Sequence, residues 1–231
     1  MPNSNESGMV KVVAAGAIAL VIGVAGGYMI ANNKSSGETS KNSTASSSVA
    51  TDTKAANLRV ALNSLEAQHV DLASAATRAG FDGSPMFKAS AGALDKNSVA
   101  LSEAVASVYG KEAGDKFLEI WRSHITFFVD YTVAAKAGDK AGMDKAVANL
   151  NGYVTAISDL LGGATGLPTE AVAALVTEHV GLLKKAVDTH GAGDYEASYA
   201  AQQEARDQIT SKIADTLAGA IVKQSPDKFS N

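Results

Sequence analysis

Apolar residues recur at intervals of three and four positions from Leu58 onward, which is the spacing of helices with one buried face. Ala, Leu, Val, Lys, Glu and Asp dominate this part of the chain, and Pro is nearly absent. The pattern is interrupted where Gly, Asp and Pro cluster. It predicts an all-α fold with six helices, over residues 57–79, 85–109, 112–137, 140–162, 168–190 and 195–223.

Short polar strings predict where these helices begin. Asp139 and Asp194 each end an Ala-Gly-Asp string, and an Asp side chain in this place caps a helix by accepting a backbone hydrogen bond. The segment 80–85 (GFDGSP) has the same role between the first two helices. Pro168 is expected in the first turn of the fifth helix, where its missing N–H costs nothing.

Three histidines occupy the same place in the first, third and fifth predicted helices. His69, His124 and His179 follow one another at intervals of 55 residues, each in the middle of an apolar heptad stripe. Each is therefore expected to face the core. The stripes are Leu62, Leu65, His69, Leu72 and Ala76; Phe117, Ile120, His124, Phe127 and Tyr131; and Val172, Leu175, His179, Leu182 and Ala186.

The alternate helices repeat as well. The second, fourth and sixth contain the related segments 101–105 (LSEAV), 157–161 (ISDLL) and 213–217 (IADTL). The domain is therefore predicted to consist of three duplicated helical hairpins that bury their faces against one another. The sequence allows two arrangements of the hairpins: a closed bundle around a pseudo-threefold axis, or an open stack. The small number of copies, without polar capping repeats, favours the six-helix bundle.

The first part of the chain predicts a membrane anchor. Residues 12–31 form an uncharged run of twenty residues, long enough for a transmembrane helix. No convincing cleavage site follows the run, which favours an uncleaved signal anchor over a cleaved signal peptide. Lysines flank it on both sides, so the positive-inside rule is nearly balanced. The short flank, residues 1–11, is placed in the cytoplasm because the whole folded part follows the span.

Residues 32–57 are rich in Ser, Thr and Asn and contain no aromatic residue. Such a segment cannot bury enough apolar surface to offset its ordering entropy, so it predicts a disordered tether. The helical domain follows at 58–223, and a C-terminal tail at 224–231. The chain is thus expected to be a single-pass protein of the cell membrane whose C-terminal domain is extracytoplasmic.

The charge and the sequence motifs limit the classes of function that are expected. The net charge is −4 and no basic run is interleaved with aromatic residues, so nucleic-acid binding is not expected. The chain has no Cys, no G-x-S-x-G motif and no phosphate-binding Gly loop. No catalytic residue is assigned, and an enzyme is not predicted.

The candidate metal ligands are His69, His124 and His179. Around a closed threefold axis they would converge, and neutral imidazole suits Cu, Zn, Ni or Fe, with Cu or Zn expected here. In an open stack they would lie about 10 Å or more apart, too far to share an ion. The alternative is that duplication copied a buried, hydrogen-bonded core histidine. Ring nitrogens within about 4–5 Å of one another would be needed for a shared ion.

One ExxH motif, Glu66 to His69, has the spacing used in di-iron bundles. The other two repeats do not complete such a site, because Glu119 lies five residues before its histidine and Glu178 directly precedes its own. A ferritin-like oxidase is therefore disfavoured.

Structural roles are predicted for the remaining polar and aromatic residues. The acids of the second, fourth and sixth helices, Glu103, Asp159 and Asp215, are expected on solvated outer faces. His190 is expected to cap the end of the fifth helix. The aromatic residues around His124 are expected to pack the core.

The segments 117–131 (FLEIWRSHITFFVDY) and 218–229 (AGAIVKQSPDKF) resemble parts of a family of uncharacterised exported bacterial helical proteins, some of which carry copper-related names. The resemblance covers roughly 58–229 and implies a helical fold and an extracytoplasmic location. Relatives often have a His-Met-x-Met cluster on the last helix, and the corresponding stretch 209–212 (ITSK) lacks it.

The sequence thus predicts a non-enzymatic binding module of the cell envelope; if the module binds a small ligand, the candidate is a transition metal held by His69, His124 and His179. The alternative is a structural or protein-interaction module with an envelope protein as partner. In that alternative the histidines only pack the core.

Overall fold

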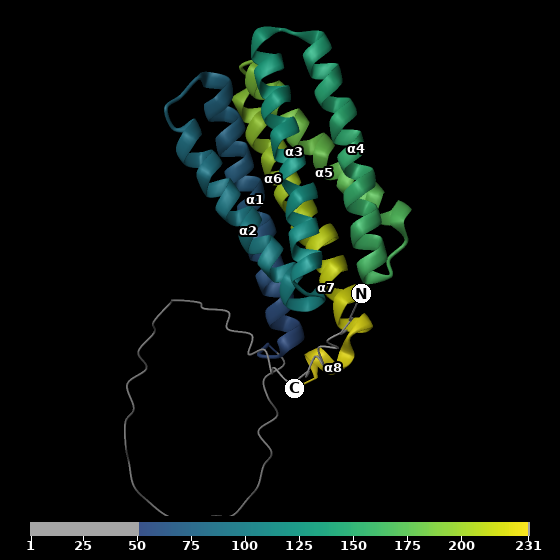
Figure 1. Cartoon of the computed structure of the whole chain (residues 1–231). Helices are drawn as coiled ribbons and strands as arrows, with labels where there is room; N and C mark the ends of the chain where they lie inside the picture. The colour runs from purple at the N-terminus through teal and green to yellow at the C-terminus, as the bar shows by residue number, and fades with distance from the viewer. Residues whose placement is uncertain (1–50, 231) are drawn as a thin grey trace, which may run out of the picture. The chain divides into compact units, whose positions relative to one another are not determined.

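The computed structural model describes residues 51–230, in which every regular element is helical (Figure 1). The elements are α1 (Lys54–Asp82), α2 (Phe87–Tyr109), α3 (Lys111–Ala137), α4 (Lys140–Thr165), α5 (Thr169–Gly191) and α6 (Tyr195–Gln208). A π-helical segment, η1 (Ile209–Ala214), continues α6 into α7 (Asp215–Gln224), and α8 (Pro226–Phe229) follows. The all-α prediction is confirmed, and all six predicted helices are present within three residues of their expected ends.

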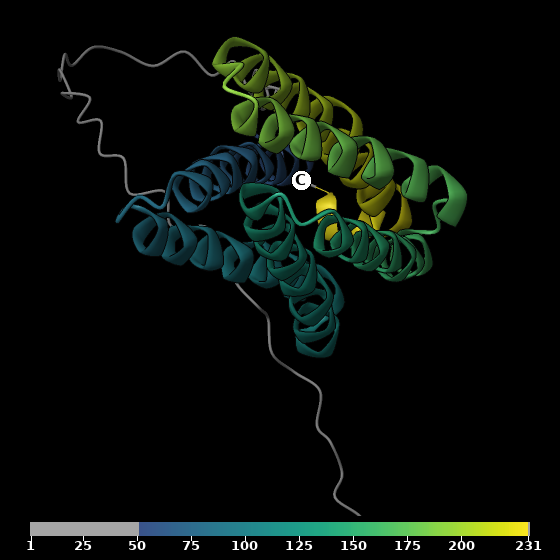
Figure 2. The same ribbon diagram turned by 90° about the horizontal axis from the view of Figure 1, so that it is seen from above.

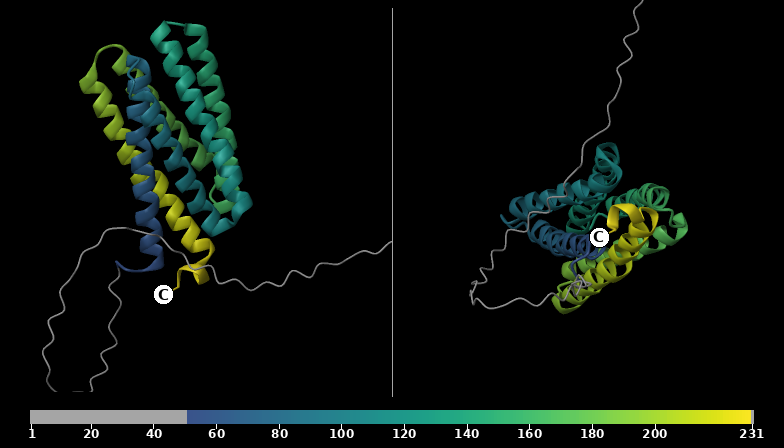
Figure 3. Two further views of the ribbon diagram at one scale, coloured as in Figure 1. Left: turned by 60° about the vertical axis from the view of Figure 1, so that its left-hand side comes forward. Right: turned by 90° about the horizontal axis from the view of Figure 1, so that it is seen from below.

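The helices pack as consecutive pairs. α1 packs with α2, α3 with α4, and α5 with the rod formed by α6, η1 and α7. The pairs adjoin through α2 and α3, through α4 and α5, and through the rod and α1, so that the bundle closes on itself. Figure 2 shows the three pairs seen from above, and the left panel of Figure 3 shows α1 beside the rod. The domain is therefore a closed helical bundle rather than an open stack.

The first helix of each pair lies on the inside. α1, α3 and α5 contact one another as well as their own partners. These are the helices that carry His69, His124 and His179. The arrangement therefore directs the three equivalent helices, and their buried faces, toward one interior.

Two predicted caps are confirmed. Asp139 Oδ1 accepts a hydrogen bond from the Gly142 backbone N–H at 3.0 Å, and Asp194 Oδ1 accepts one from Ala197 at the same distance. The preceding glycines, Gly138 and Gly193, have φ angles of 67° and 79°, a left-handed conformation that suits glycine and ends a helix. The turns between α3 and α4 and between α5 and α6 are thus built alike.

Three of the boundaries that differ from the prediction have a local cause in the structure. α1 begins at Lys54, inside the predicted tether, because the Thr53 side chain caps it by accepting from Ala56 N–H at 3.0 Å. α1 also continues through Gly80 and ends only at Gly83, whose φ is 68°. Pro168 precedes α5 instead of opening it, because its ψ of 125° is extended.

The predicted anchor at 12–31, its flank at 1–11 and the tether up to residue 50 lie outside the described residues. Within residues 51–230, no helix combines the length and the apolar character needed to cross a bilayer. Part of the predicted tail at 224–231 is helical, since α8 lies within it.

Candidate functional site: a buried histidine layer

The buried face of α1, α3 and α5 is turned slightly from the predicted stripe. The histidines and the residues seven positions before and after them are buried, as predicted. The predicted neighbours four before and three after, such as Leu65 and Leu72, are only half-buried. Residues three before and four after each histidine are buried instead: Glu66, Trp121 and Val176, and Ala73, Phe128 and Leu183. Glu66 therefore occupies a core position whose counterparts are apolar or aromatic.

The three predicted ligands meet in the middle of the bundle. The ring centroid of His69 lies 5.4 Å from that of His124 and 6.0 Å from that of His179. The side chains are 0%, 3% and 6% exposed for His69, His124 and His179 respectively. The repeat spacing thus brings the three equivalent residues into one buried cluster, which we call the histidine layer.

Most ring nitrogens of the histidine layer lack a hydrogen-bond partner among the described residues. Both ring nitrogens of His69 and of His179, and Nδ1 of His124, are buried without a partner among the described residues. Oε2 of Glu66 and Nε1 of Trp121 are buried and unpaired as well. Native proteins pair most buried polar atoms, and an unpaired one costs about 1–3 kcal/mol. A ligand that bonds the imidazoles would remove much of this cost.

Burial keeps the histidine layer neutral. It lowers the pKa of His124 to about 3, with charge repulsion from His179 as a second cause, and that of His179 to about 4, where the side-chain amide of Gln208 partly opposes the shift. The pKa of His69 is lowered well below its ordinary value, first by burial and then by the two other histidines. Burial raises the pKa of Glu66 to about 8. At neutral pH the imidazoles are therefore unprotonated and Glu66 is mostly a neutral acid.

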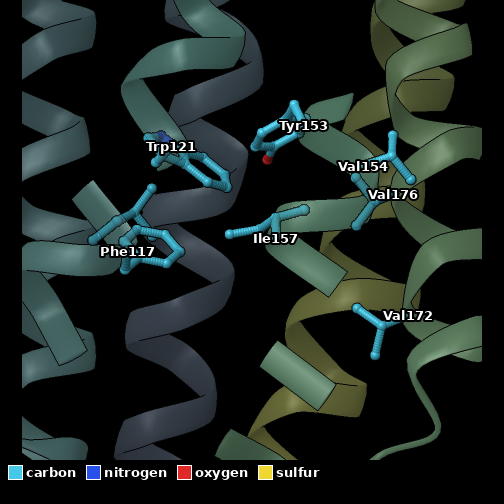
Figure 4. Close-up of a cluster of buried hydrophobic side chains, with 8 residues drawn as sticks. Phe117, Trp121, Tyr153, Val154, Ile157, Val172 and Val176 are labelled. Atoms are coloured by element: carbon cyan, nitrogen blue, oxygen red, sulfur yellow. The ribbon is translucent and has the colours of Figure 1, made fainter. Parts of the chain in front are cut away.

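Aromatic rings enclose the histidine layer. The Trp121 ring lies 4.8 Å from that of His69 and 4.7 Å from that of His124, and the Tyr153 ring lies 4.5 Å from that of His124. Figure 4 shows Trp121 and Tyr153 at the edge of an apolar cluster completed by Phe117 and Ile157. The pKa of Tyr153 is raised by burial and by Glu66. The aromatic residues around His124 therefore pack the core, as predicted, and contact the rings of His69 and His124.

Two buried amides support the layer in an equivalent way. Asn97 Nδ2 donates to the Leu65 carbonyl at 3.0 Å, and Gln208 Nε2 donates to the Leu175 carbonyl at 2.9 Å. Leu65 and Leu175 each lie four residues before a repeat histidine. Sequence reasoning missed both amides, although a polar residue on the apolar face of a helix was a usable signal.

The π-helical segment η1 lies where the third hairpin differs from the first in the spacing after the buried amide. Asn97 lies four residues before the buried Leu101, whereas Gln208 lies five residues before the equivalent Ile213. The third hairpin thus contains one more residue than the first between these two equivalent positions. A π-helix accommodates one extra residue without interrupting the helix, and such segments are frequent at functional sites.

The distances of the His69 ring from its two partners suit a shared ion, but the side chains as they lie do not form a metal site. Three imidazoles around one tetrahedral ion, at metal–nitrogen distances of about 2.1 Å, have ring centroids about 5 Å apart. His69 lies near this spacing from both partners. As the side chains lie, no three His, Cys, Asp or Glu residues among the residues described form a set of metal ligands. The rings would have to turn about their side-chain bonds to share an ion.

The acids of the other predicted sites lie on the surface. Glu119 is exposed, and Glu178 pairs with Lys212 at 2.7 Å, so neither joins Glu66 in a di-iron site. Glu103 and Asp159 are exposed, as predicted. Asp215 is half-buried and accepts hydrogen bonds from Arg59 at 2.6 Å and Asn63 at 2.8 Å.

His190 lies in the last turn of α5, as predicted, but its side chain bonds to another helix rather than to the end of its own. Its Nε2 lies 2.8 Å from Asp82 Oδ1 at the end of α1, and its ring lies against Phe81 and Tyr195. Asp82 is 108 residues away in the sequence, and only the folded bundle brings the two together. His190 therefore joins two helices.

Fold and site define an all-helical bundle with a buried, neutral histidine layer. No protein-family model, curated protein or solved structure matches the chain. The resemblance to exported helical proteins is therefore unsupported by a match and stays a prediction.

Proposed function

We propose that the domain is a non-enzymatic binding module and that His69, His124 and His179 together bind a transition metal, copper or zinc. The observation that carries the proposal is the set of buried ring nitrogens without partners in a cluster of three histidines. A core histidine copied by duplication would be expected to keep a hydrogen-bond partner. A metal ion would supply the missing bonds, because each neutral imidazole offers one lone pair.

Charge in the histidine layer supports the same proposal. The imidazoles are already neutral, so a metal ion need not displace protons from them. Glu66 lies one helical turn from His69 and is buried with no charged partner. An ion bound beside it would favour its carboxylate form, which would offset part of the added positive charge.

We also propose that the three helix pairs are duplicated hairpins of a membrane-anchored, extracytoplasmic protein. The duplication is supported by the interval of 55 residues, by the like caps of Asp139 and Asp194, and by the like amide contacts of Asn97 and Gln208. The location is supported by the uncharged run at 12–31 and by the tether that follows it.

Metal competition tests the binding proposal. The full-length chain is titrated with Cu²⁺ or Zn²⁺ against a chelator of known affinity, and quenching by Cu²⁺ is followed in the fluorescence of Trp121, the only Trp of the chain. We expect one ion per chain with submicromolar affinity. His124→Gln should weaken binding at least a hundredfold because one ligand of three is lost.

His190→Gln is the matched control, because His190 is also buried but lies outside the histidine layer and is bonded to Asp82. It should leave the metal affinity unchanged. Equal, weak binding by the unsubstituted chain and by both variants would refute the metal site. That result would favour a structural or protein-interaction module.

A further inference from the structure

A cavity of about 340 Å³ opens beside the histidine layer. It runs between α1 and α3, with the first part of α2 on its other side, from His69 and His124 to the turn between α1 and α2. α2 and α3 pack tightly at their other ends, where a Cβ on Gly114 would lie 2.7 Å from Ala106 Cβ. Figure 1 shows the two helices separating from that junction toward the α1–α2 turn, and the cavity lies where they are apart.

The walls of the cavity are apolar. Its lining contains no Asp, Glu, Lys or Arg, and it includes Ala73, Leu94, Phe87 and Phe128. The hydroxyls of Thr77 and Thr132, which also line it, already donate to the carbonyls of Ala73 and Phe128 at 2.9 and 2.7 Å. The walls therefore offer contact area but few free hydrogen bonds.

Free polar groups lie at the histidine end. His69 and His124 line the cavity there, and Ser74 lies about one turn beyond His69. These side chains are 0%, 3% and 3% exposed for His69, His124 and Ser74, and both nitrogens of His69, Nδ1 of His124 and Oγ of Ser74 have no partner among residues 51–230. Buried polar atoms without partners point to a molecule that bonds to them. An apolar wall with a few free polar groups at one end is typical of a small-molecule site.

Size and charge restrict the ligand. An engineered cavity of about 150 Å³ in another protein holds benzene, so a cavity about twice as large suits a molecule of two fused rings. Phe87 and Phe128 can pack against aromatic rings edge to face. A charged ligand would be buried without a counter-ion, because no charged side chain lines the cavity.

We propose that this cavity binds a neutral, mainly aromatic small molecule of two-ring size whose hydroxyl or N–H group is hydrogen-bonded by His69 and His124. A neutral imidazole both donates and accepts, so the pair can satisfy either group. The proposal does not depend on a bound metal. The exposed Val133, which is 64% exposed and lines the cavity, lies at its mouth and gives the ligand an apolar entrance.

The test is calorimetric titration of the full-length chain with 2-naphthol in excess chelator, so that no metal takes part. We expect a single site with micromolar affinity. Naphthalene-2-sulfonate, which has the same rings and a fixed negative charge, should bind at least tenfold more weakly. Equal binding of the two probes would overturn the proposal, as would the absence of 2-naphthol binding.

Two variants locate the site. Val133→Trp should block the mouth and weaken 2-naphthol binding at least tenfold, whereas Val60→Trp, at a valine 66% exposed on α1 outside the cavity lining, should not change it. Ala76→Leu fills the cavity from α1 and should have the same effect as Val133→Trp. Thermal unfolding checks that each variant is folded. Unchanged affinity in folded Val133→Trp and Ala76→Leu would place the probe elsewhere and refute the proposal.

The metal and the cavity proposals can fail separately. Loss of 2-naphthol binding with intact Cu²⁺ binding would refute only the cavity. Binding of 2-naphthol in chelator, with no metal bound at submicromolar concentration, would support the cavity and refute the metal site.

Discussion

The histidine layer and the His190 pair use the same residue type in opposite ways. His190 is buried at the end of the bundle, where Asp82 lies 2.8 Å from its Nε2 and two aromatic rings flank it. His69, His124 and His179 are at least as deeply buried, but five of their six ring nitrogens are buried without partners among the described residues. The His190 arrangement is that of a structural histidine. The difference supports the proposal that the three central histidines bind a ligand.

The two kinds of histidine also differ in their contribution to the free energy of folding. Each unpaired buried polar group costs about 1–3 kcal/mol, a large share of the total stability of a domain. Local rules are broken in natural proteins mainly at functional sites, where another gain compensates. The two kinds of histidine should therefore differ in their effects on stability and on proton binding.

The largest effect is expected in acid. Unfolded histidine takes up a proton near its ordinary pKa of 6.5, whereas the buried His179 does so only near 4. Between these values the unfolded state binds more protons, so the free energy of unfolding falls as the pH is lowered. His179 alone should account for a loss of about 3 kcal/mol between pH 6.5 and 4. Urea unfolding of the metal-free chain at a series of pH values measures this loss.

Glu66 should act in the opposite sense. Its carboxyl keeps its proton up to a pH of about 8 in the folded chain but loses it near 4.5 when unfolded, so stability falls as the pH rises between these values. Stability should therefore be greatest near pH 6.5. In a plot of the free energy of unfolding against pH, His179→Leu should reduce the slope on the acid side of the maximum, and Glu66→Gln should reduce it on the alkaline side. An unchanged slope on the acid side in His179→Leu would contradict the assignment.

A smaller effect, of opposite sign for the two kinds of histidine, is expected at neutral pH. His179→Leu removes two buried unpaired nitrogens and should raise the free energy of unfolding of the metal-free chain by about 1–2 kcal/mol. His190→Ala removes a bonded ring and should lower it by about 1–2 kcal/mol. Chemical denaturation of the two variants measures both changes. Similar destabilisation by both would mean that His179 is a structural residue as well.

The smallest effect concerns protons released when metal binds. At about pH 5.5, three ordinary surface histidines would release close to three protons per ion, because most would be protonated. The histidine layer is neutral at that pH, so only Glu66 has a proton to lose. Calorimetry in buffers of different ionisation enthalpy should give about one proton per ion, and close to none in Glu66→Gln. A value near three would contradict the neutral state of the layer.

Much of the fold could be predicted from the sequence. Periodic apolar positions and Gly-Asp strings located the six helices, and the interval of 55 residues indicated equivalent positions for His69, His124 and His179. Once the bundle is closed, equivalent positions on its inner helices meet. The sequence did not determine whether the bundle closes, because the apolar pattern indicates which face of a helix is buried but not which helices become neighbours.

The same limit explains what was missed. Residues three and four positions from a histidine both lie about one helical turn from it. The sequence therefore favoured the apolar Leu65 over its neighbour Glu66 as the buried residue, although the structure buries Glu66. The contact of His190 with Asp82 joins distant parts of the chain and leaves no local pattern. The cavity arises from the divergence of α2 and α3, which depends on their packing at Gly114.

The most direct test of the central claim is a long-range ¹H–¹⁵N spectrum of the histidine rings before and after one equivalent of Zn²⁺. The full-length chain has four histidines, and single His→Gln variants assign their signals. We predict that His69, His124 and His179 start as neutral rings and that all three shift on adding zinc, while His190 does not. Rings of the histidine layer that remain unchanged at one equivalent would contradict a metal site built from them.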